Sequence, residues 1–131
     1  MNKSNTIQTE IQRVILVEDD YTASDVISDF LEDEGFEVLS FDSTEEAKKE
    51  VKQTDILIVD VRIRNNPSAG VDFIIAIRKD DANFKNAKTI FISNFGRLKE
   101  IEEKLQQLEE RFIWIDKPFE MSTLALAIEE E

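Results

Sequence analysis

Five polar side chains in this sequence each stand at or just after the end of a short apolar run. They are Glu18, Asp19, Asp60, Ser93 and Lys117. Three carboxylates held within a few Å repel one another, by about 4 kcal/mol for one pair 4 Å apart at an effective dielectric constant near 20. A lysine and a hard divalent cation would offset that repulsion, and Mg²⁺ suits a site of few carboxylates completed by water. In such a site Asp60 could act as a nucleophile and form an aspartyl phosphate.

Each of these residues also has an ordinary structural explanation when it is taken alone. Aspartate and serine are common where a strand turns, and acidic pairs favour the first turn of a helix. A lysine before a proline is usually a solvated loop charge. The interpretation as a site therefore depends on all five side chains meeting at one edge of one sheet.

The apolar runs have the length and composition of strands that are covered on both faces. Unbroken aliphatic runs of this kind are typical of parallel sheets. We expect five strands, at residues 13–17, 36–41, 54–60, 89–92 and 112–115.

A helical pattern follows each strand. Val26, Ile27, Phe30 and Leu31 have the spacing of one helical face, and the expected helix ends at Gly35. The other expected helices run from a capping box at 43–46 to about residue 52, over 70–79, over 98–108 and over 120–129. In the fourth helix, an apolar stripe is predicted from Leu98, Ile101, Leu105 and Leu108.

This alternation predicts an α/β fold of the flavodoxin-like (βα)5 type. The expected sheet has five parallel strands in the order 2-1-3-4-5, with helices on both faces. In such open sheets the ligand crevice lies outside the carboxyl ends of the strands. The five polar side chains would then converge at that edge.

Composition limits the classes of function. The 131 residues suffice for one domain, expected at 13–131 behind a flexible tail at 1–12. A net charge of −13, from 29 acidic and 16 basic residues, argues against direct nucleic-acid binding. The chain has no Cys and no His, which excludes thiol chemistry and phosphohistidine. No apolar run reaches membrane length, so we expect a cytoplasmic protein without membrane contact.

Five motifs give the chain a resemblance to a known family. They are VILVEDD (14–20), ILIVDVR (56–62), GVDFIIAIR (70–78), TIFISN (89–94) and WIDKPF (114–119). With them, residues 12–130 resemble the receiver domain of two-component response regulators.

The resemblance implies a role for each polar residue at the strand ends. Asp60 looks like the phosphoacceptor. Asp19 would bind Mg²⁺ directly, Glu18 through water, and the main-chain carbonyl of Arg62 would complete the protein ligands. Ser93 looks like the switch hydroxyl, and Lys117 looks like the ion pair to the phosphoryl group, with a cis bond to Pro118.

The chain also departs from the family pattern near the site. The loop between Asp60 and Gly70 is a couple of residues longer than usual. Asn94 stands where a small residue is common, and Trp114 stands where the family often has Tyr or Phe as a rotamer switch. Family positions flanking the attacking water correspond to Arg62 and Phe95, whose bulk is expected to prolong the phosphorylated state.

The function implied by the resemblance is a phosphorylation-switched signalling module. A sensor histidine kinase or a histidine phosphotransfer protein would supply the phosphoryl group, and a downstream target or output domain would receive the signal. Apart from its own aspartyl phosphorylation and dephosphorylation, no enzymatic activity is expected. Leu126 is expected to point outward, which favours a homodimer through the last two helices.

Three other functions compete with this one. A pseudo-receiver would keep the fold and bind partners without phosphorylation. A Mg²⁺-dependent aspartyl-phosphate phosphatase would need an acid two residues after the nucleophile, where this chain has Arg62. A flavin-binding protein would need a phosphate-cradling loop after the first strand, which is acidic here.

Overall fold

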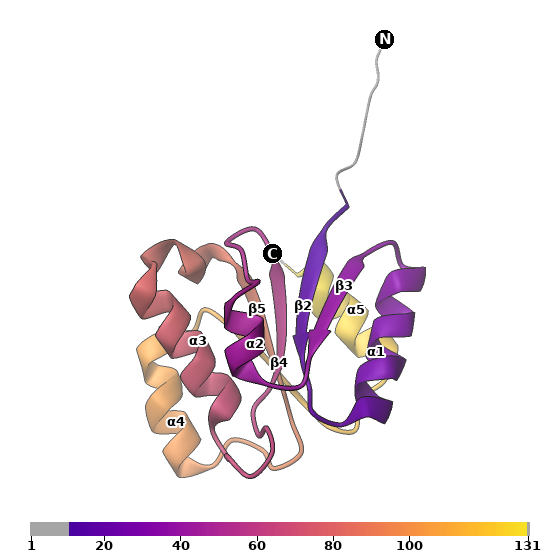
Figure 1. Cartoon of the computed structure of the whole chain (residues 1–131). Coiled ribbons are helices and arrows are strands. Elements are labelled where there is room, and N and C mark those ends of the chain that lie inside the picture. Colours follow the sequence, from indigo (N-terminus) through magenta and orange to yellow (C-terminus); the bar gives the residue numbers. More distant parts are fainter. Residues whose placement is uncertain (1–10, 131) are drawn as a thin grey trace.

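The computed structural model describes residues 11–130 and contains a single parallel sheet between two layers of helices (Figure 1). Its strands are β2 (Arg13–Val17), β3 (Glu37–Phe41), β4 (Ile56–Asp60), β5 (Lys88–Ser93) and β6 (Ile113–Asp116). Its helices are α1 (Tyr21–Asp33), α2 (Thr44–Lys48), α3 (Ala69–Asp80), α4 (Lys99–Leu105) and α5 (Met121–Glu129), with 3₁₀ turns η1 (Ala82–Asn86) and η2 (Gln106–Leu108). Residues 1–10 of the expected N-terminal tail lie outside the described part.

The strand order confirms the predicted topology. The spatial order is β3-β2-β4-β5-β6, and every neighbouring pair is parallel. Counted along the chain this is the order 2-1-3-4-5. Helical crossovers of one hand keep all five strands parallel, so their carboxyl ends lie at the same edge of the sheet.

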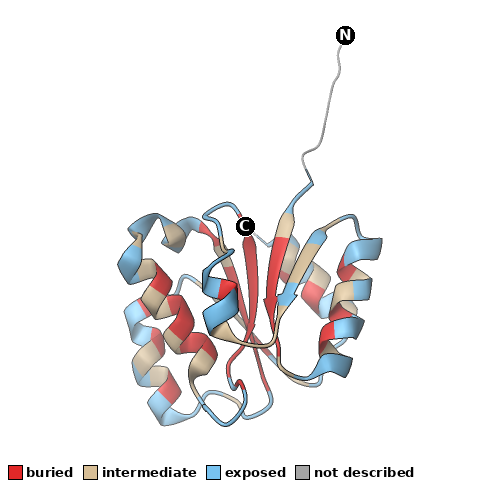
Figure 2. Ribbon diagram, in the orientation of Figure 1, coloured by how far each residue is buried: buried red, intermediate tan, exposed pale blue. Residues whose placement is uncertain are grey.

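The core lies on both sides of the sheet, because alternate residues of each strand face opposite helix layers. Ile15 and Val17 pack toward α2, α3 and α4, whereas Val14 and Leu16 pack toward α1 and α5. All four residues of β2 after Arg13 are fully buried. The central strands are therefore the most deeply buried part of the molecule (Figure 2).

Three details of the predicted helices are wrong. Val26 is 51% exposed, because the buried line of α1 runs through Ser24, Ile27 and Leu31 and leaves Val26 on the flank. Leu98 is 50% exposed, because it is the extended residue before α4 and precedes the helical stripe. α2 ends at Lys48, four residues early, because the following residues turn back to enter β4.

No helix in residues 11–130 combines the length and the apolar character needed to cross a membrane. On α5, Leu126 is 69% exposed, as expected.

Candidate functional site

The carboxyl ends of β2 and β4 bring three acidic side chains together. Oxygen atoms of Glu18, Asp19 and Asp60 all lie within 4.8 Å of one another. Glu18 and Asp60 are only 2% and 5% exposed, whereas Asp19 is half-buried. The cluster forms because β2 and β4 are adjacent and parallel, so the residues that end them share one edge.

Lys117 places its ammonium group between two of these carboxylates. Its Nζ atom lies 2.7 Å from Glu18 Oε1 and 3.0 Å from Asp60 Oδ2. The backbone holds the lysine there, because the Lys117 amide donates a hydrogen bond to the Ser93 carbonyl at 2.7 Å. The peptide bond to Pro118 is cis, as the resemblance implied.

Burial and crowding change the acidity of this cluster. Burial, together with the neighbouring Asp60, raises the pKa of Glu18 from 4.5 to about 7, although Lys117 acts in the opposite direction. Burial alone would lower the pKa of Lys117, but hydrogen bonds to Glu18 and Asp60 outweigh it and raise that pKa. The lysine therefore stays charged, while the Glu18 carboxyl loses its proton only as the pH rises through about 7.

The long loop after Asp60 folds back over the acidic cluster. The main-chain amide of Arg64 donates a hydrogen bond to Asp19 Oδ2. A tight turn between Ile63 and Asn66 makes this approach, with Arg64 in the left-handed region at φ 59°. The loop therefore orients Asp19 through the Arg64 amide, although residues 64–67 are themselves exposed.

Gly70 is required where α3 passes the end of β4. A Cβ atom at this position would lie 2.2 Å from the Asp60 carbonyl oxygen and 2.8 Å from Val59 Cγ1. The Gly70 amide donates to the Val61 carbonyl at 2.9 Å. Sequence reasoning used Gly70 only to mark the start of a helix and missed this close approach.

Ser93 and Asn94 stand at the end of β5, beside the end of β4. Ser93 is buried, and its hydroxyl oxygen accepts a hydrogen bond from the Phe95 amide at 3.2 Å. Asn94 is exposed and lines a hollow of about 270 Å³ together with the three carboxylates and Lys117.

Arg62 and Phe95 touch each other across the mouth of this hollow. The guanidinium carbon of Arg62 lies 5.2 Å from the centre of the Phe95 ring, which is 55% exposed. The sequence singled out both residues separately, but their stacking depends on the path of two different loops.

Trp114 on β6 is partly buried and packs against the apolar core on the side of the sheet that carries Phe91. Its indole nitrogen donates to Asp116 at 2.9 Å, and its ring lies 6.0 Å from that of Phe91. Arg97, which the sequence did not single out, stacks on Trp114 at 5.5 Å and on Phe112 at 5.4 Å. Arg97 also pairs with Glu102 of α4, so it connects the loop after β5 to both elements.

Comparisons with known proteins agree with this geometry. The family model described as response regulator receiver domain matches residues 14–129. No curated protein sequence matches the chain significantly.

Solved structures share the fold. The chemotaxis response regulator CheY4 of Vibrio cholerae is similar at 23% identity, covering 92% of this chain and 98% of that one, with a TM-score of 0.75. A CheY-like receiver domain protein from Methanospirillum hungatei is 19% identical, covering 92% of each chain, with a TM-score of 0.76. A sensor protein from Polaromonas is 25% identical, covering 90% of this chain and 93% of that one, with a TM-score of 0.74.

The family match spans nearly the whole described chain and includes every residue of the acidic cluster together with Lys117. This chain therefore belongs to the response regulator receiver domain family.

Proposed function

We propose that this receiver is switched by phosphorylation of Asp60. The observation that carries the proposal is the Lys117 ammonium shared by Glu18 and Asp60, with Asp19 in the same cluster. Phosphoryl transfer needs mainly positioning and charge neutralisation, and these groups are already held in place by adjacent strand ends.

The transfer would use only groups at this edge of the sheet. An Asp60 carboxylate oxygen attacks the phosphorus of a phosphohistidine, the P–N bond breaks, and the neutral imidazole leaves with the electron pair and a proton from solvent. Lys117 then pairs with a phosphoryl oxygen, and the Ser93 hydroxyl turns from the Phe95 amide toward the phosphoryl group. A sensor histidine kinase or a histidine phosphotransfer protein would be the donor, because the chain itself has no His.

The donor set fits Mg²⁺. All the side-chain ligands are carboxylate oxygens, and when fully ionised the three carboxylates and one ammonium leave a formal charge of −2. Glu18, Asp19, Asp60 and the Arg62 carbonyl would hold the ion. When bound, it supplies positive charge that neutralises the carboxylates and the phosphoryl oxygens.

The signal would leave through a change in the partner-binding surface, read by a downstream protein or output domain. We propose residues 13–131 as the receiver unit, in line with the family match at 14–129. Exposed Leu126 on α5 favours the face formed by the last two helices as a contact with a second copy. No activity on a separate substrate is proposed.

Intact-protein mass spectrometry tests the proposal. Incubation with acetyl phosphate and Mg²⁺ should add one phosphoryl group, which should be absent in Asp60→Asn and lost when Mg²⁺ is chelated. Asp20→Asn is the matched control, because Asp20 lies in the same hollow but caps α1, and Asn caps a helix as well as Asp.

No adduct after a fast quench, and no binding of beryllofluoride, would contradict phosphorylation. The chain would then act as a pseudo-receiver, binding its partner regardless of phosphorylation.

A further inference from the structure

Seven cations gather at the amino ends of the strands, the opposite edge of the sheet from Asp60. They line three hollows of about 700, 280 and 210 Å³. Lys88 belongs to the first and third hollows and Lys85 to the second and third, so the hollows adjoin. We call this surface the basic edge; its cations are Arg13, Lys52, Arg78, Lys79, Lys85, Lys88 and Arg111.

Most of these charges have no partner of opposite sign. Among residues 11–130, eight Lys and Arg side chains have no carboxylate oxygen within 4.0 Å, and six of the eight lie on the basic edge. The other two are Arg62 and Lys99. Within the described chain, the one cation of this surface that has a carboxylate partner is Arg13, at 3.0 Å from Asp55. Burial, and after it the charge of Arg111, lower the pKa of Arg78, whereas Glu109 acts in the opposite direction.

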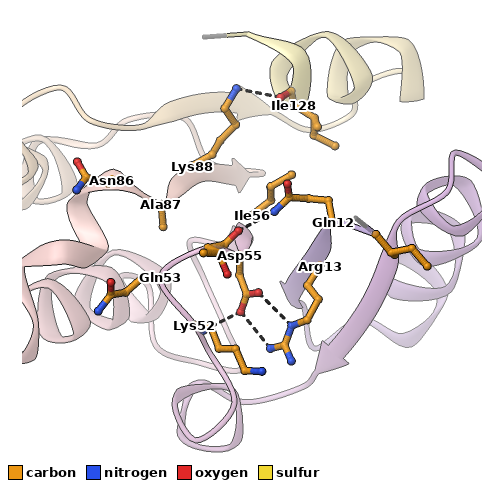
Figure 3. Close-up of a pocket in the computed structure, with 12 residues that line it drawn as sticks. Gln12, Arg13, Lys52, Gln53, Asp55, Ile56, Asn86, Ala87, Lys88 and Ile128 are labelled. Atoms are coloured by element: carbon orange, nitrogen blue, oxygen red, sulfur yellow. Dashed lines mark hydrogen bonds and ion pairs between the residues drawn. The ribbon is translucent and has the colours of Figure 1, made fainter. Parts of the chain in front are cut away.

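The carboxylates at this surface are fewer and are not available to all the cations. Those lining the hollows are Asp55, Glu109, Glu110 and Glu130, which against seven cations leave a formal charge of +3 on a chain of −13. Asp55 is already occupied, because both its oxygens accept from Arg13 and one also accepts from the Lys52 amide at 2.7 Å (Figure 3).

In the largest hollow, two ammonium groups, those of Lys52 and Lys88, have no carboxylate partner among residues 11–130. Lys88 reaches the last turn of α5 and donates to the carbonyls of Ala127 and Ile128, the second of which is drawn in Figure 3. These carbonyls carry no formal charge. The Lys52 ammonium makes no hydrogen bond to any residue of the described chain. Both groups remain able to bind a carboxylate from outside.

Apolar side chains alternate with these cations along the whole surface. Ile11, Ile56 and Ile128 line the first hollow, Ile75 and Leu108 the second, and Phe112 and Ile113 the third. Such a surface is complementary to a chain that carries carboxylates and apolar side chains in turn.

We propose that the basic edge binds an acidic segment of a partner protein in which Asp or Glu alternates with apolar residues. At physiological salt the Debye length is about 8 Å, so the acidic groups at the far edge do not cancel this local attraction. The net charge of −13 disfavours a nucleic acid, because its phosphate backbone would extend beyond the basic edge and be repelled by the acidic remainder of the protein. Hollows lined by both cations and apolar side chains fit the side chains of a peptide better than a flat layer of lipid headgroups.

A fluorescent peptide of alternating Glu and Leu, followed by fluorescence anisotropy, tests this proposal with the full chain. The peptide should bind saturably, more weakly as salt rises, and a version with Gln in place of Glu should not bind. Amide chemical shifts should change around Lys52 and Lys88 and remain unchanged around Asp60. Asp60→Asn should bind equally well, because the proposal does not depend on phosphorylation.

Two double variants that change the net charge equally separate a local site from a general charge effect. Lys52→Gln with Lys85→Gln should weaken peptide binding about five- to tenfold, the sum of two exposed ion pairs. Lys99→Gln with Lys104→Gln, both on α4, should change it less than twofold. Lys52 and Lys85 make no side-chain bond within residues 11–130, so the first variant should keep the fold.

Four results would overturn the proposal. They are no binding of the Glu–Leu peptide, equal binding of its Gln version, equal losses in both double variants, and tighter binding of a single-stranded oligonucleotide or of phosphatidylserine vesicles.

Discussion

Glu18 is the residue whose ionisation conflicts most with its surroundings. It is almost fully buried beside Asp60, and its pKa is raised to about 7. The folded protein therefore holds a proton that the unfolded chain releases near pH 4.5. Stability from this proton is fully present below pH 4.5 and is lost as the pH rises through 7.

We expect the free energy of unfolding in EDTA to fall between pH 5 and pH 8, by up to about 3 kcal/mol from this one group. Glu18→Gln keeps the shape of the side chain but cannot ionise, so it should flatten the profile in this window. Urea unfolding at several pH values measures the free energy of unfolding of wild type and of the Glu18→Gln variant. An identical slope in wild type and variant would assign the pH dependence to other groups.

At Gly70, helix propensity and close packing predict opposite effects of an alanine on the stability of the protein. Alanine usually stabilises a helix by about 1 kcal/mol relative to glycine. Here its Cβ would collide with the Asp60 carbonyl, so Gly70→Ala should lower the free energy of unfolding by roughly 1–3 kcal/mol. Thermal unfolding of the variant decides between these two expectations. A variant more stable than wild type would mean that α3 can move away from the Asp60 carbonyl at little cost.

Arg62 and Phe95 are expected to lengthen the lifetime of the phosphorylated state, because their stacked side chains cover the mouth of the hollow. Removing either one breaks a cation–π contact of about 0.5–1 kcal/mol. Arg62→Ala and Phe95→Ala should each shorten the half-life of the phosphorylated protein, roughly two- to fivefold. Mass spectrometry after removal of the donor gives the half-life, and Arg64→Ala serves as the control. Unchanged half-lives in both alanine variants would refute the covering role.

At the scale of elements, the strands were predictable and the connections were not. Runs such as residues 14–17 are buried on both faces, so composition alone locates them. The acidic cluster follows from strand order, because Glu18 and Asp60 end adjacent strands. By contrast, the Arg64 turn over Asp19 and the stacking of Arg97 depend on loop paths that no local pattern encodes.

Arg97 connects the loop after β5 to β6 and α4, and we expect it to keep Trp114 in place. Because Trp114 is the only tryptophan, tryptophan fluorescence reports on the surroundings of this one side chain. Arg97→Gln removes the stacked guanidinium, so acrylamide should quench the fluorescence more strongly than in wild type. Arg111→Gln is the control, since Arg111 lies at the basic edge. Equal quenching in all three proteins would show that Phe91 packing alone holds the indole.

At the scale of the whole molecule, charge is unevenly distributed. The carboxyl edge of the sheet gathers the acidic cluster, whereas the amino edge gathers seven cations, of which six have no carboxylate partner among residues 11–130. The net charge of −13 also makes the compact state repel itself. Salt should therefore stabilise the fold in general, and a cation bound at the acidic cluster should stabilise it specifically.

These two effects can be separated by the response to Mg²⁺. At a Mg²⁺ concentration ten times its dissociation constant, binding to the folded state alone adds about 1.4 kcal/mol, which corresponds to a rise in Tm of about 5–6 °C for a domain of this size. NaCl at matched ionic strength should give only the general part of the increase. Asp19→Asn should lose the specific part, whereas Asp20→Asn, which leaves the cluster intact, should keep it.

The gain in stability from Mg²⁺ should also be smaller at pH 5.5 than at pH 8, because the ion must displace the proton on Glu18. Equal shifts with Mg²⁺ and NaCl in all three proteins would mean that the cluster binds no divalent ion and that only self-repulsion is being screened.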